Sequence, residues 1–423
     1  MSRQAALAFM DKHGMLAQRI DPLPEARRMA EAMEAGLLAD GAALPMIPTY
    51  LRTDGTVPAG ERSVVIDAGG TNFRAALVRF TDEGPVTEHM YKTKMPGIGK
   101  AATWEEFISF TADALEPLMP LADDIGFCFS YSAVITPEID GRVICIDKEV
   151  VITGSAGQLV GASLLRELER RGYPGTRVVI LNDTAAVLLG GAAVLDKSRC
   201  GGLIGQVSGT GTNTCCVLPL RRIRKLGRDE DTRILVNLES GLYDGLPRGD
   251  FDLLLDRESN NPGVKFLEKL TAGVYLGNLA RLMLEAAGEE GLLAPESREA
   301  LCALGRFDAA VLDAWACGER LEAYAAEDRP FVQTVAQELF ERSARAMCAN
   351  LAGILLLTGE GADPDRPVVI CAEGSLVQKG RYYRPALWEH LSHCAEALGR
   401  HVRLQVGEET TLPGAAAAAL LNR

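Results

Sequence analysis

The feature that most constrains the fold is a repeated pattern in which a β-like run, a glycine-rich turn and a second β-like run follow one another. The first copy reads SVVIDAGGTNFRAALVRF over 63–80, and the second reads GGLIGQVSGTGTNTCCVL over 201–218. Each copy predicts two strands joined by a glycine turn. Because β-like runs alternate with helical patterns around both copies, we expect two α/β domains with a ligand cleft between them.

Composition excludes several classes of function. The 423 residues carry 44 Lys and Arg against 57 Asp and Glu, a net charge of −13 that disfavours nucleic acid and anionic membranes as partners. Ten cysteines occur without a Cys-x-x-Cys pair, and no apolar tract reaches the about 18 residues that a membrane span needs. The amino-terminal apolar stretch is too short for a secretory signal, so we expect a cytoplasmic protein with reduced thiols.

The first glycine turn has the chemistry of a phosphate site. A strand that ends at Asp67 runs into Gly69, Gly70, Thr71 and Asn72, where backbone amides can approach a phosphate without an obstructing Cβ. A hairpin turn uses the same residues with no ligand at all, and one Gly-Gly-Thr does not separate the two interpretations. The spacing excludes the dinucleotide fingerprint, and no Gly-Lys-Ser/Thr of a P-loop is present.

Two further features favour the phosphate interpretation: a second turn at 209–213 and an Asn182-Asp183-Thr184 sequence at the end of an apolar strand. Together they suggest ATP held across a cleft. At this point the chain resembles the hexokinases of the actin-like ATPase superfamily. The matching motifs are DAGGTNFRAALV (67–78), GFCFSYS (126–132), LNDTAA (181–186), SGTGTNTCCV (208–217), VNLESG (236–241), FLEKLTAGVYLGNLAR (266–281) and CAEGSL (371–376).

The resemblance implies an ATP- and Mg²⁺-dependent kinase that transfers the γ-phosphoryl group to the 6-hydroxyl of a hexose, with glucose as the leading substrate. Asp183 would be the general base that takes the proton of the attacking hydroxyl. The implied hexose ligands are Ser130, Asp147, Lys148, Asn182, Asn213, Glu239 and Glu268. The implied nucleotide ligands are Asp67, Gly69, Gly70, Thr71, Asn72, Arg74, Thr210, Gly211, Gly374, Ser375 and Thr411, with Asp67 near Mg²⁺ through water.

The resemblance also implies two actin-like (ribonuclease H-like) α/β domains. We expect a helical segment at 1–59 that packs on the large domain, a small domain at 60–183, a large domain at 184–405, and a helix at 406–423 that returns to the small domain. The sequence leaves the choice between a monomer and a homodimer open.

The chain departs from the family pattern where hexokinases usually carry Thr-Lys, because it has Asp147-Lys148 instead. This change adds a carboxylate to the predicted sugar pocket and leaves other hexoses or derivatives, such as mannose, fructose or an amino sugar, as alternative substrates. Ser132 replaces a usual proline, and the 408–414 stretch lacks the usual extra glycines. A catalytically weak, hexokinase-like sugar-binding regulator is the alternative from another class, although Asp67, Asp183 and both turns are retained.

Overall fold

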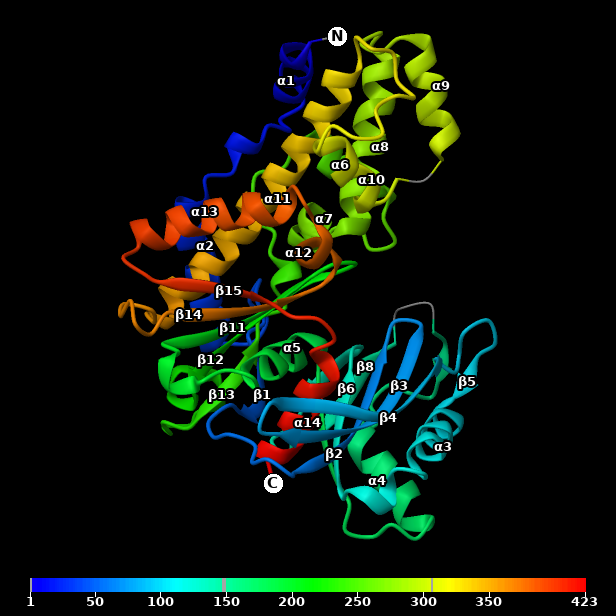
Figure 1. Ribbon diagram of the computed structural model, residues 1–423, viewed down its shortest axis with the longest axis vertical. Helices are drawn as coiled ribbons and strands as arrows, with labels where there is room; N and C mark the ends of the chain where they lie inside the picture. Colours follow the sequence, from blue (N-terminus) through cyan, green and yellow to red (C-terminus); the bar gives the residue numbers. More distant parts are fainter. Residues whose placement is uncertain (1, 147–149, 306) are drawn as a thin grey trace.

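The structure, a computed structural model, describes residues 2–146, 150–305 and 307–423. It is an elongated molecule with two α/β halves, each built on its own sheet (Figure 1). The half that holds the amino terminus contains a six-stranded sheet and most of the helices, and the other half contains a five-stranded sheet. The prediction of two α/β units is therefore confirmed.

The five-stranded sheet of the small half has the strand order β10-β6-β2-β3-β4. Its strands are β2 (Arg62–Gly69), β3 (Asn72–Thr81), β4 (Gly84–Lys94), β6 (Asp124–Phe129) and β10 (Arg177–Leu181). β2, β6 and β10 run parallel, so their carboxyl ends meet at one edge of the sheet. The first glycine turn, Ser130 and Asn182 directly follow these three ends, which explains why residues distant in sequence converge there.

The six-stranded sheet of the large half has the strand order β1-β13-β12-β11-β14-β15. Its strands are β1 (Ile47–Arg52), β11 (Gly202–Ser208), β12 (Thr212–Pro219), β13 (Arg233–Asn237), β14 (Val368–Glu373) and β15 (Val402–Val406). β11, β14 and β15 are parallel, and the second glycine turn, Gly374 and the 407–410 loop follow their carboxyl ends. The two halves thus place corresponding loops at the ends of parallel strands.

Helices and short ribbons complete both halves. The small half adds α3 (Trp104–Leu115), α4 (Val160–Arg170) and two short pairs, β5 (Ala102–Thr103) with β9 (Ile152–Thr153) and β7 (Ser132–Ile135) with β8 (Gly141–Cys145). The helices of the large half are α1 (Arg3–Lys12), α2 (Pro22–Leu38), α6 (Asp250–Glu258), α7 (Phe266–Thr271), α8 (Gly273–Glu289), α9 (Pro295–Leu304), α10 (Ala309–Ala316), α11 (Arg329–Thr358), α12 (Ser375–Lys379) and α13 (Tyr383–Ala397). The 30-residue α11 forms much of the core of that half.

The amino-terminal segment differs from the purely helical expectation. After α1 and α2, residues 47–52 form β1, which pairs antiparallel with β13 and extends the large sheet. The sequence concealed this strand because Pro45 and Pro48 read as breakers that end a helix. Pro48 is tolerated because β1 is the edge strand of its sheet, where a missing amide donor disrupts no second partner.

Two helices lie between the sheets: α5 (Asp183–Ala192) and α14 (Thr411–Leu421) (Figure 1). α5 packs mainly on α14 and on β11 of the large sheet, whereas α14 packs on β6 and β2 of the small sheet. The run Ala415–Ala419 is buried throughout, and its small side chains allow the two helices and the sheet to approach closely. The catalytic candidate Asp183 is the first residue of α5 in this layer.

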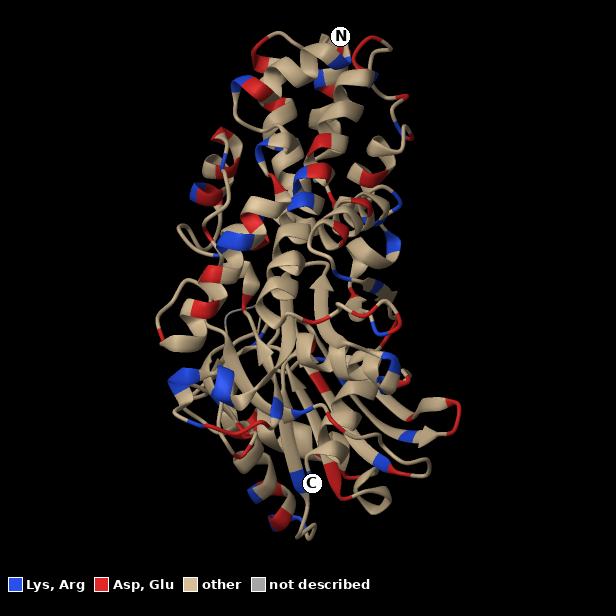
Figure 2. Cartoon of the chain, turned by 90° about the vertical axis from the view of Figure 1, so that its left-hand side faces the viewer, with Lys and Arg blue, Asp and Glu red and all other residues tan. Residues whose placement is uncertain are grey.

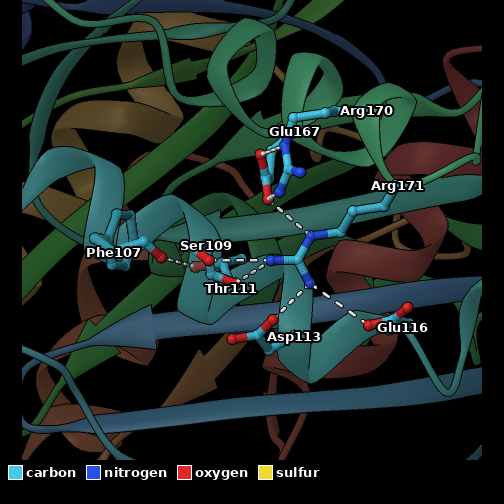
Figure 3. Close-up of polar contacts among 8 residues, drawn as sticks. All are labelled: Phe107, Ser109, Thr111, Asp113, Glu116, Glu167, Arg170 and Arg171. Atoms are coloured by element: carbon cyan, nitrogen blue, oxygen red, sulfur yellow. Dashed lines mark hydrogen bonds and ion pairs between the residues drawn. The ribbon is translucent and has the colours of Figure 1, made fainter.

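Polar contacts of Arg171 hold α3 and α4 together at the outer side of the small half (Figure 3). Its guanidinium donates to Glu167 through Nε (2.8 Å), to Asp113 through Nη1 (2.5 Å), and to Ser109 O and Oγ through Nη2 (3.2 and 3.0 Å). Hydrogen bonds from Arg170 and Arg171 lower the pKa of Glu167 to about 2. The two helices that cover this face of the small sheet are therefore joined by charge as well as by packing.

Basic and acidic residues are interspersed over the face that Figure 2 shows, in both halves of the molecule. Within the described ranges, no helix combines the length and the apolar character that crossing a bilayer requires.

Candidate active site

The first glycine turn joins β2 to β3 as an antiparallel hairpin in which Asp67 lies opposite Arg74 and Gly69 lies opposite Asn72. Gly70 has a φ of 60°, in the left-handed region. The hydroxyl of Tyr131 donates to the carbonyl of Gly70 at 2.9 Å. The amide of Met95 donates to the carbonyl of Thr71 at 3.0 Å, so the turn is held at both Gly70 and Thr71, and the predicted phosphate residues of the first motif are adjacent in space.

Asp67 and Arg74 form a partly buried ion pair at the base of this turn. Arg74 donates to Oδ2 of Asp67 from Nε (2.9 Å) and from Nη2 (2.6 Å). Burial raises the pKa of Asp67, the charge of Arg74 opposes that rise, and the charge of Asp183 adds to it. Arg74 therefore stabilises the ionised carboxylate in an environment that would otherwise favour its protonated form.

Ser130 lies directly against the first turn. Its amide donates to Ala68 O at 3.1 Å, and a Cβ built on Gly69 would lie 3.1 Å from both Cβ and Oγ of Ser130. A predicted sugar residue and a predicted phosphate residue are therefore neighbours in the small half. Asp147 and Lys148, two further predicted sugar residues of this half, lie outside the described residues.

The second glycine turn is enclosed by other elements of the large half. Gly209 accepts at 2.8 Å from the amide of Gly273, the first residue of α8, and its own amide donates to Gly211 O at 3.0 Å. Gly209 is buried, whereas Thr210 at the tip is exposed. The base of the turn is therefore enclosed, while its tip is accessible.

Gly374 and Ser375, the predicted adenosine residues, lie against this base. Gly374 has a φ of 117°, and a Cβ on it would lie 2.4 Å from Ser208 O. A Cβ on Gly209 would lie 3.2 Å from the amide nitrogen of Ser375. Only glycine fits at 374, so the approach of the β14 loop to the second turn is set by that residue.

Glu268, a predicted sugar ligand on α7, also lies against the second turn. Its Oε2 accepts from the amide of Thr212 at 3.2 Å and would lie 3.0 Å from a Cβ on Gly211. Its Oε1 lies 3.6 Å from Nζ of Lys265. The second turn therefore also pairs a predicted phosphate residue with a predicted sugar residue.

Glu239 is held by two amides. Its Oε1 accepts from Nδ2 of Asn237 at 2.5 Å and from Nδ2 of Asn213 at 3.2 Å, and Asn213 also donates to Oδ1 of Asn237 at 2.9 Å. Glu239 has a φ of 55°, unusual for a residue with a side chain. Oε2 of Glu239 accepts no hydrogen bond from any described residue.

Asn237 was not predicted as a site residue, although a buried amide at the end of the apolar strand ILVN was a signal that could have found it. A buried polar side chain at the end of a strand that leads into a predicted site needs partners, and those partners are site residues here.

Asp183 is the first residue of α5, and Asn182 is the N-cap, whose Oδ1 accepts from the amide of Ala185 at 3.0 Å. Oδ1 of Asp183 accepts from the amide (2.7 Å) and the hydroxyl (3.1 Å) of Thr184. Its Oδ2 has no hydrogen-bond partner in the described part of the chain. The helix that Asp183 begins lies between the two sheets, and the charge of Asp183 raises the pKa of both Asp67 in the small half and Glu239 in the large half.

Thr411 is buried at the start of α14, and no contact joins its side chain to the predicted adenosine residues among the described residues. Its neighbour Thr410 is the residue that connects to that loop, through hydrogen bonds from its amide (3.0 Å) and its hydroxyl to Oε2 of Glu373. The loop that precedes α14 is therefore fastened to the end of β14. A role of Thr411 itself in nucleotide binding stays a prediction.

Two family models described as Hexokinase match the chain, one over residues 203–421, which is more than half of it, and the other over residues 23–193. The chain belongs to the hexokinase family. The rice (Oryza sativa subsp. japonica) protein "Hexokinase-4, chloroplastic" is 32% identical over 292 residues, which cover 63% of this chain and 56% of that protein. The chain thus spans little more than half the length of that relative. The Aspergillus niger "Glucokinase" is 26% identical over 488 residues, covering 98% of this chain and 97% of that protein.

The fold comparison agrees. The structure of the Schistosoma mansoni hexokinase complexed with glucose matches with a TM-score of 0.76 at 22% identity, covering 99% of this chain and 100% of that one. This likeness confirms the predicted two-domain α/β architecture of the chain. The predicted family membership is confirmed by the family models.

Proposed function

We propose that this hexokinase transfers the γ-phosphoryl group of ATP to the 6-hydroxyl of a hexose, with glucose as the preferred substrate. The observation that carries the proposal is the position of Asp183, which begins α5 just after the carboxyl end of β10, in the helix layer between the two sheets. Its charge acts on Asp67 beside the first glycine turn and on Glu239 beside the second. A base between a phosphate site and a site for hydroxyl groups is the arrangement that phosphoryl transfer to an alcohol requires. The glucose complex of the S. mansoni hexokinase supports the choice of sugar.

In the proposed reaction the hexose hydroxyl lies against Oδ2 of Asp183. This oxygen is available because Oδ1 is already engaged by Thr184. As the bond between the sugar oxygen and the γ-phosphorus forms, the hydroxyl proton passes to Oδ2. The bond between the γ-phosphorus and the bridging oxygen breaks, ADP leaves with that oxygen, and Asp183 later releases its proton to solvent.

Sugar binding would use acceptors and donors from both halves, with Ser130, Asp147, Lys148 and Asn182 on one side and Asn213, Glu239 and Glu268 on the other. Glu239 and Glu268 are the only two of these that supply carboxylates from the large half. Each carboxylate oxygen accepts hydrogen bonds without donating any, so the large half selects ligands that present hydroxyl donors. A pyranose meets this requirement.

The residues around Asp67 fit Mg²⁺. Oδ2 of Asp67 is engaged by Arg74, so Oδ1 is the oxygen that could face a hydrated ion. No cluster of three or more His, Cys, Asp or Glu suited to a metal occurs among the described residues. Mg²⁺ commonly binds one or two carboxylates, waters and substrate phosphates, so a single carboxylate beside a phosphate turn suffices. When bound, the ion would neutralise charge on the β- and γ-phosphates.

The nucleotide itself would lie along both turns, with phosphate contacts from Gly69, Gly70, Thr71, Asn72, Arg74, Thr210 and Gly211. Gly374, Ser375 and Thr411 would border the adenosine. The packing of Gly374 and Ser375 on the second turn supports this assignment, because it places the predicted adenosine and phosphate residues side by side. We further propose a cytoplasmic enzyme of glycolysis, monomeric or homodimeric, and the ten free cysteines are consistent with a reducing compartment.

The proposed function is tested by measuring ADP release from MgATP with a panel of glucose, mannose, fructose, glucosamine and N-acetylglucosamine, and by locating the phosphate on each product by ³¹P NMR and mass spectrometry. We expect glucose 6-phosphate as the product with the highest kcat/KM, and slow ATP hydrolysis without sugar. Binding of a hexose with no phosphorylated product from any of them would favour the sugar-binding regulator. A different preferred hexose would point to the Asp147 position as the cause.

A further inference from the structure

We propose that Asn237 is a positioning residue of this site, which holds Oε1 of Glu239 so that Oε2 alone faces the hexose as an ionised acceptor. The inference rests on the proposed function and adds a residue to it. Asn237 is buried at the end of β13, two residues before Glu239, and is tied to Asn213 and Glu239 alone among the described side chains.

The hydrogen bonds of the two amides assign their roles. Nδ2 of Asn237 donates to Oε1 of Glu239, and its Oδ1 accepts from Asn213. Oδ1 of Asn213 accepts from the amides of Thr214 (2.8 Å) and Ser240 (3.2 Å), while its Nδ2 donates to both Asn237 and Glu239. Both hydrogens and both lone pairs of Asn213 are thus used, so it would have to release one of these bonds to reach a sugar.

This arrangement also fixes the backbone of Glu239. The residue adopts the left-handed region at φ 55° and ψ 45°, which is strained for a non-glycine residue and persists only where surrounding contacts enforce it. The bond from the amide of Ser240 to Asn213 holds the turn just after Glu239, and the bond from Asn237 holds its side chain. The carboxylate is therefore fixed from both ends.

The electrostatic setting explains why a neutral amide donor is needed there. Burial raises the pKa of Glu239, and the charges of Asp183 on α5 and Glu268 on α7 raise it further. The hydrogen bond from Asn237 is the largest influence that lowers it, followed by the charge of Lys265 just before α7. Without that donor, a buried carboxylate facing two others would be protonated at higher pH and would lose its function as an acceptor.

The decisive variant is Asn237→Asp, which has the same shape, keeps an acceptor for Asn213 and replaces only the donor to Glu239 by a second carboxylate. We expect the glucose Kd from titration calorimetry at pH 7.5 to rise at least tenfold. The pH below which glucose affinity falls, the acid limb of the binding profile, should rise by at least one unit. KM for ATP should change by less than threefold, and kcat at saturating glucose should fall less than kcat/KM for glucose.

Two further variants keep the test decisive. Asn260→Asp makes the same charge change at an exposed loop position of the large half and should leave the glucose Kd and its pH profile unchanged. If Asn237→Asp does not fold, Asn237→Ala removes both bonds without adding charge and should still raise the glucose Kd and shift its acid limb in the same direction. A wild-type protein that phosphorylates glucose, together with an unchanged pH profile in the Asn237 variants, overturns the inference alone. A wild-type protein that neither binds nor phosphorylates any hexose overturns the proposed function.

Discussion

The two glycine turns share a sequence pattern but have different surroundings. The turn between β2 and β3 is a hairpin between two inner strands of the small sheet, with Asn72 exposed, and it is held by bonds from the Tyr131 hydroxyl to Gly70 O and from the Met95 amide to Thr71 O. The turn between β11 and β12 has its base buried against the first residue of α8, the start of α12 and Glu268 of α7. A similar motif is therefore exposed in one half and enclosed by three helices in the other. Substitutions should therefore have local effects in the first turn and combined effects in the second.

The largest contrast is expected between Gly374→Ala and Gly70→Ala. The alanine Cβ at 374 would meet Ser208 O at 2.4 Å with φ at 117°, so the adenosine loop and the second turn must separate. Displacing the adenosine loop by the amount that such a clash requires should lower kcat/KM for ATP on the order of 10²-fold. A Cβ at 70 meets no protein atom within 4 Å, so Gly70→Ala costs the left-handed conformation, about 1–2 kcal/mol of stability, and obstructs only a phosphate that approaches the turn. We therefore expect the smaller loss of kcat/KM for ATP at position 70, and equal losses in steady-state assays of both variants would remove the distinction between the turns.

Arg74→Met tests the charge balance of the first turn. Burial and the charge of Asp183 raise the pKa of Asp67, and Arg74 is the group that opposes them, so its removal should raise that pKa further. We expect kcat/KM for ATP to fall on the order of tenfold at neutral pH, the usual scale for unpairing a partly buried charge, and its acid limb to move to higher pH. The pH dependence of kcat/KM measures this shift, and a parallel loss at every pH would contradict it.

Gly211→Ala and Gly69→Ala compare the contact that each turn makes with a predicted sugar residue. The added Cβ would lie 3.0 Å from Oε2 of Glu268 in the first case and 3.1 Å from Ser130 in the second. Displacing one hydrogen-bonding group by a few tenths of an ångström costs about 1 kcal/mol, or about fivefold in KM for the hexose. Because Glu268 is also bound to the amide of Thr212, Gly211→Ala should have the larger effect. Steady-state titrations of sugar and ATP check whether KM for sugar responds in both.

The smallest effect on activity is expected at Arg171, whose side chain contacts Ser109, Asp113, Glu116 and Glu167 and no described residue of either turn (Figure 3). Arg171→Met removes the bonds to Asp113 and Ser109 that join α3 to α4 and should lower the free energy of unfolding by about 1 kcal/mol, which for a chain of 423 residues is about 1 °C in Tm, with kcat unchanged. Arg170→Met is the matched control, because Arg170 is exposed and pairs only with Glu167 among the described residues, so its Tm should hardly move. Thermal unfolding followed by circular dichroism compares the two.

The sequence predicts the parts of the site that depend on local signals, and it misses the parts that depend on contacts between distant residues. Both turns, their flanking strands and the strand-to-helix position of Asp183 could be predicted because each depends on local signals: alternating apolar residues, glycines and an Asn N-cap. The enclosure of the second turn could not, because Gly374 and Glu268 reach it from positions more than 50 residues away along the chain. The same holds for Asn237, whose partners are set by the register of β12 on β13, and for β1, whose strand identity depends on an edge that only the assembled sheet provides.

The central claim is that Asp183, between the two turns, takes the proton of the hexose hydroxyl. The most direct test is kcat of Asp183→Asn with glucose and MgATP, with the glucose Kd measured alongside to show that the site is intact. Asparagine keeps the shape and cannot accept the proton as a carboxylate does, so kcat should fall on the order of 10²–10⁴-fold while the glucose Kd stays within about threefold. Turnover close to that of the wild type would contradict the account.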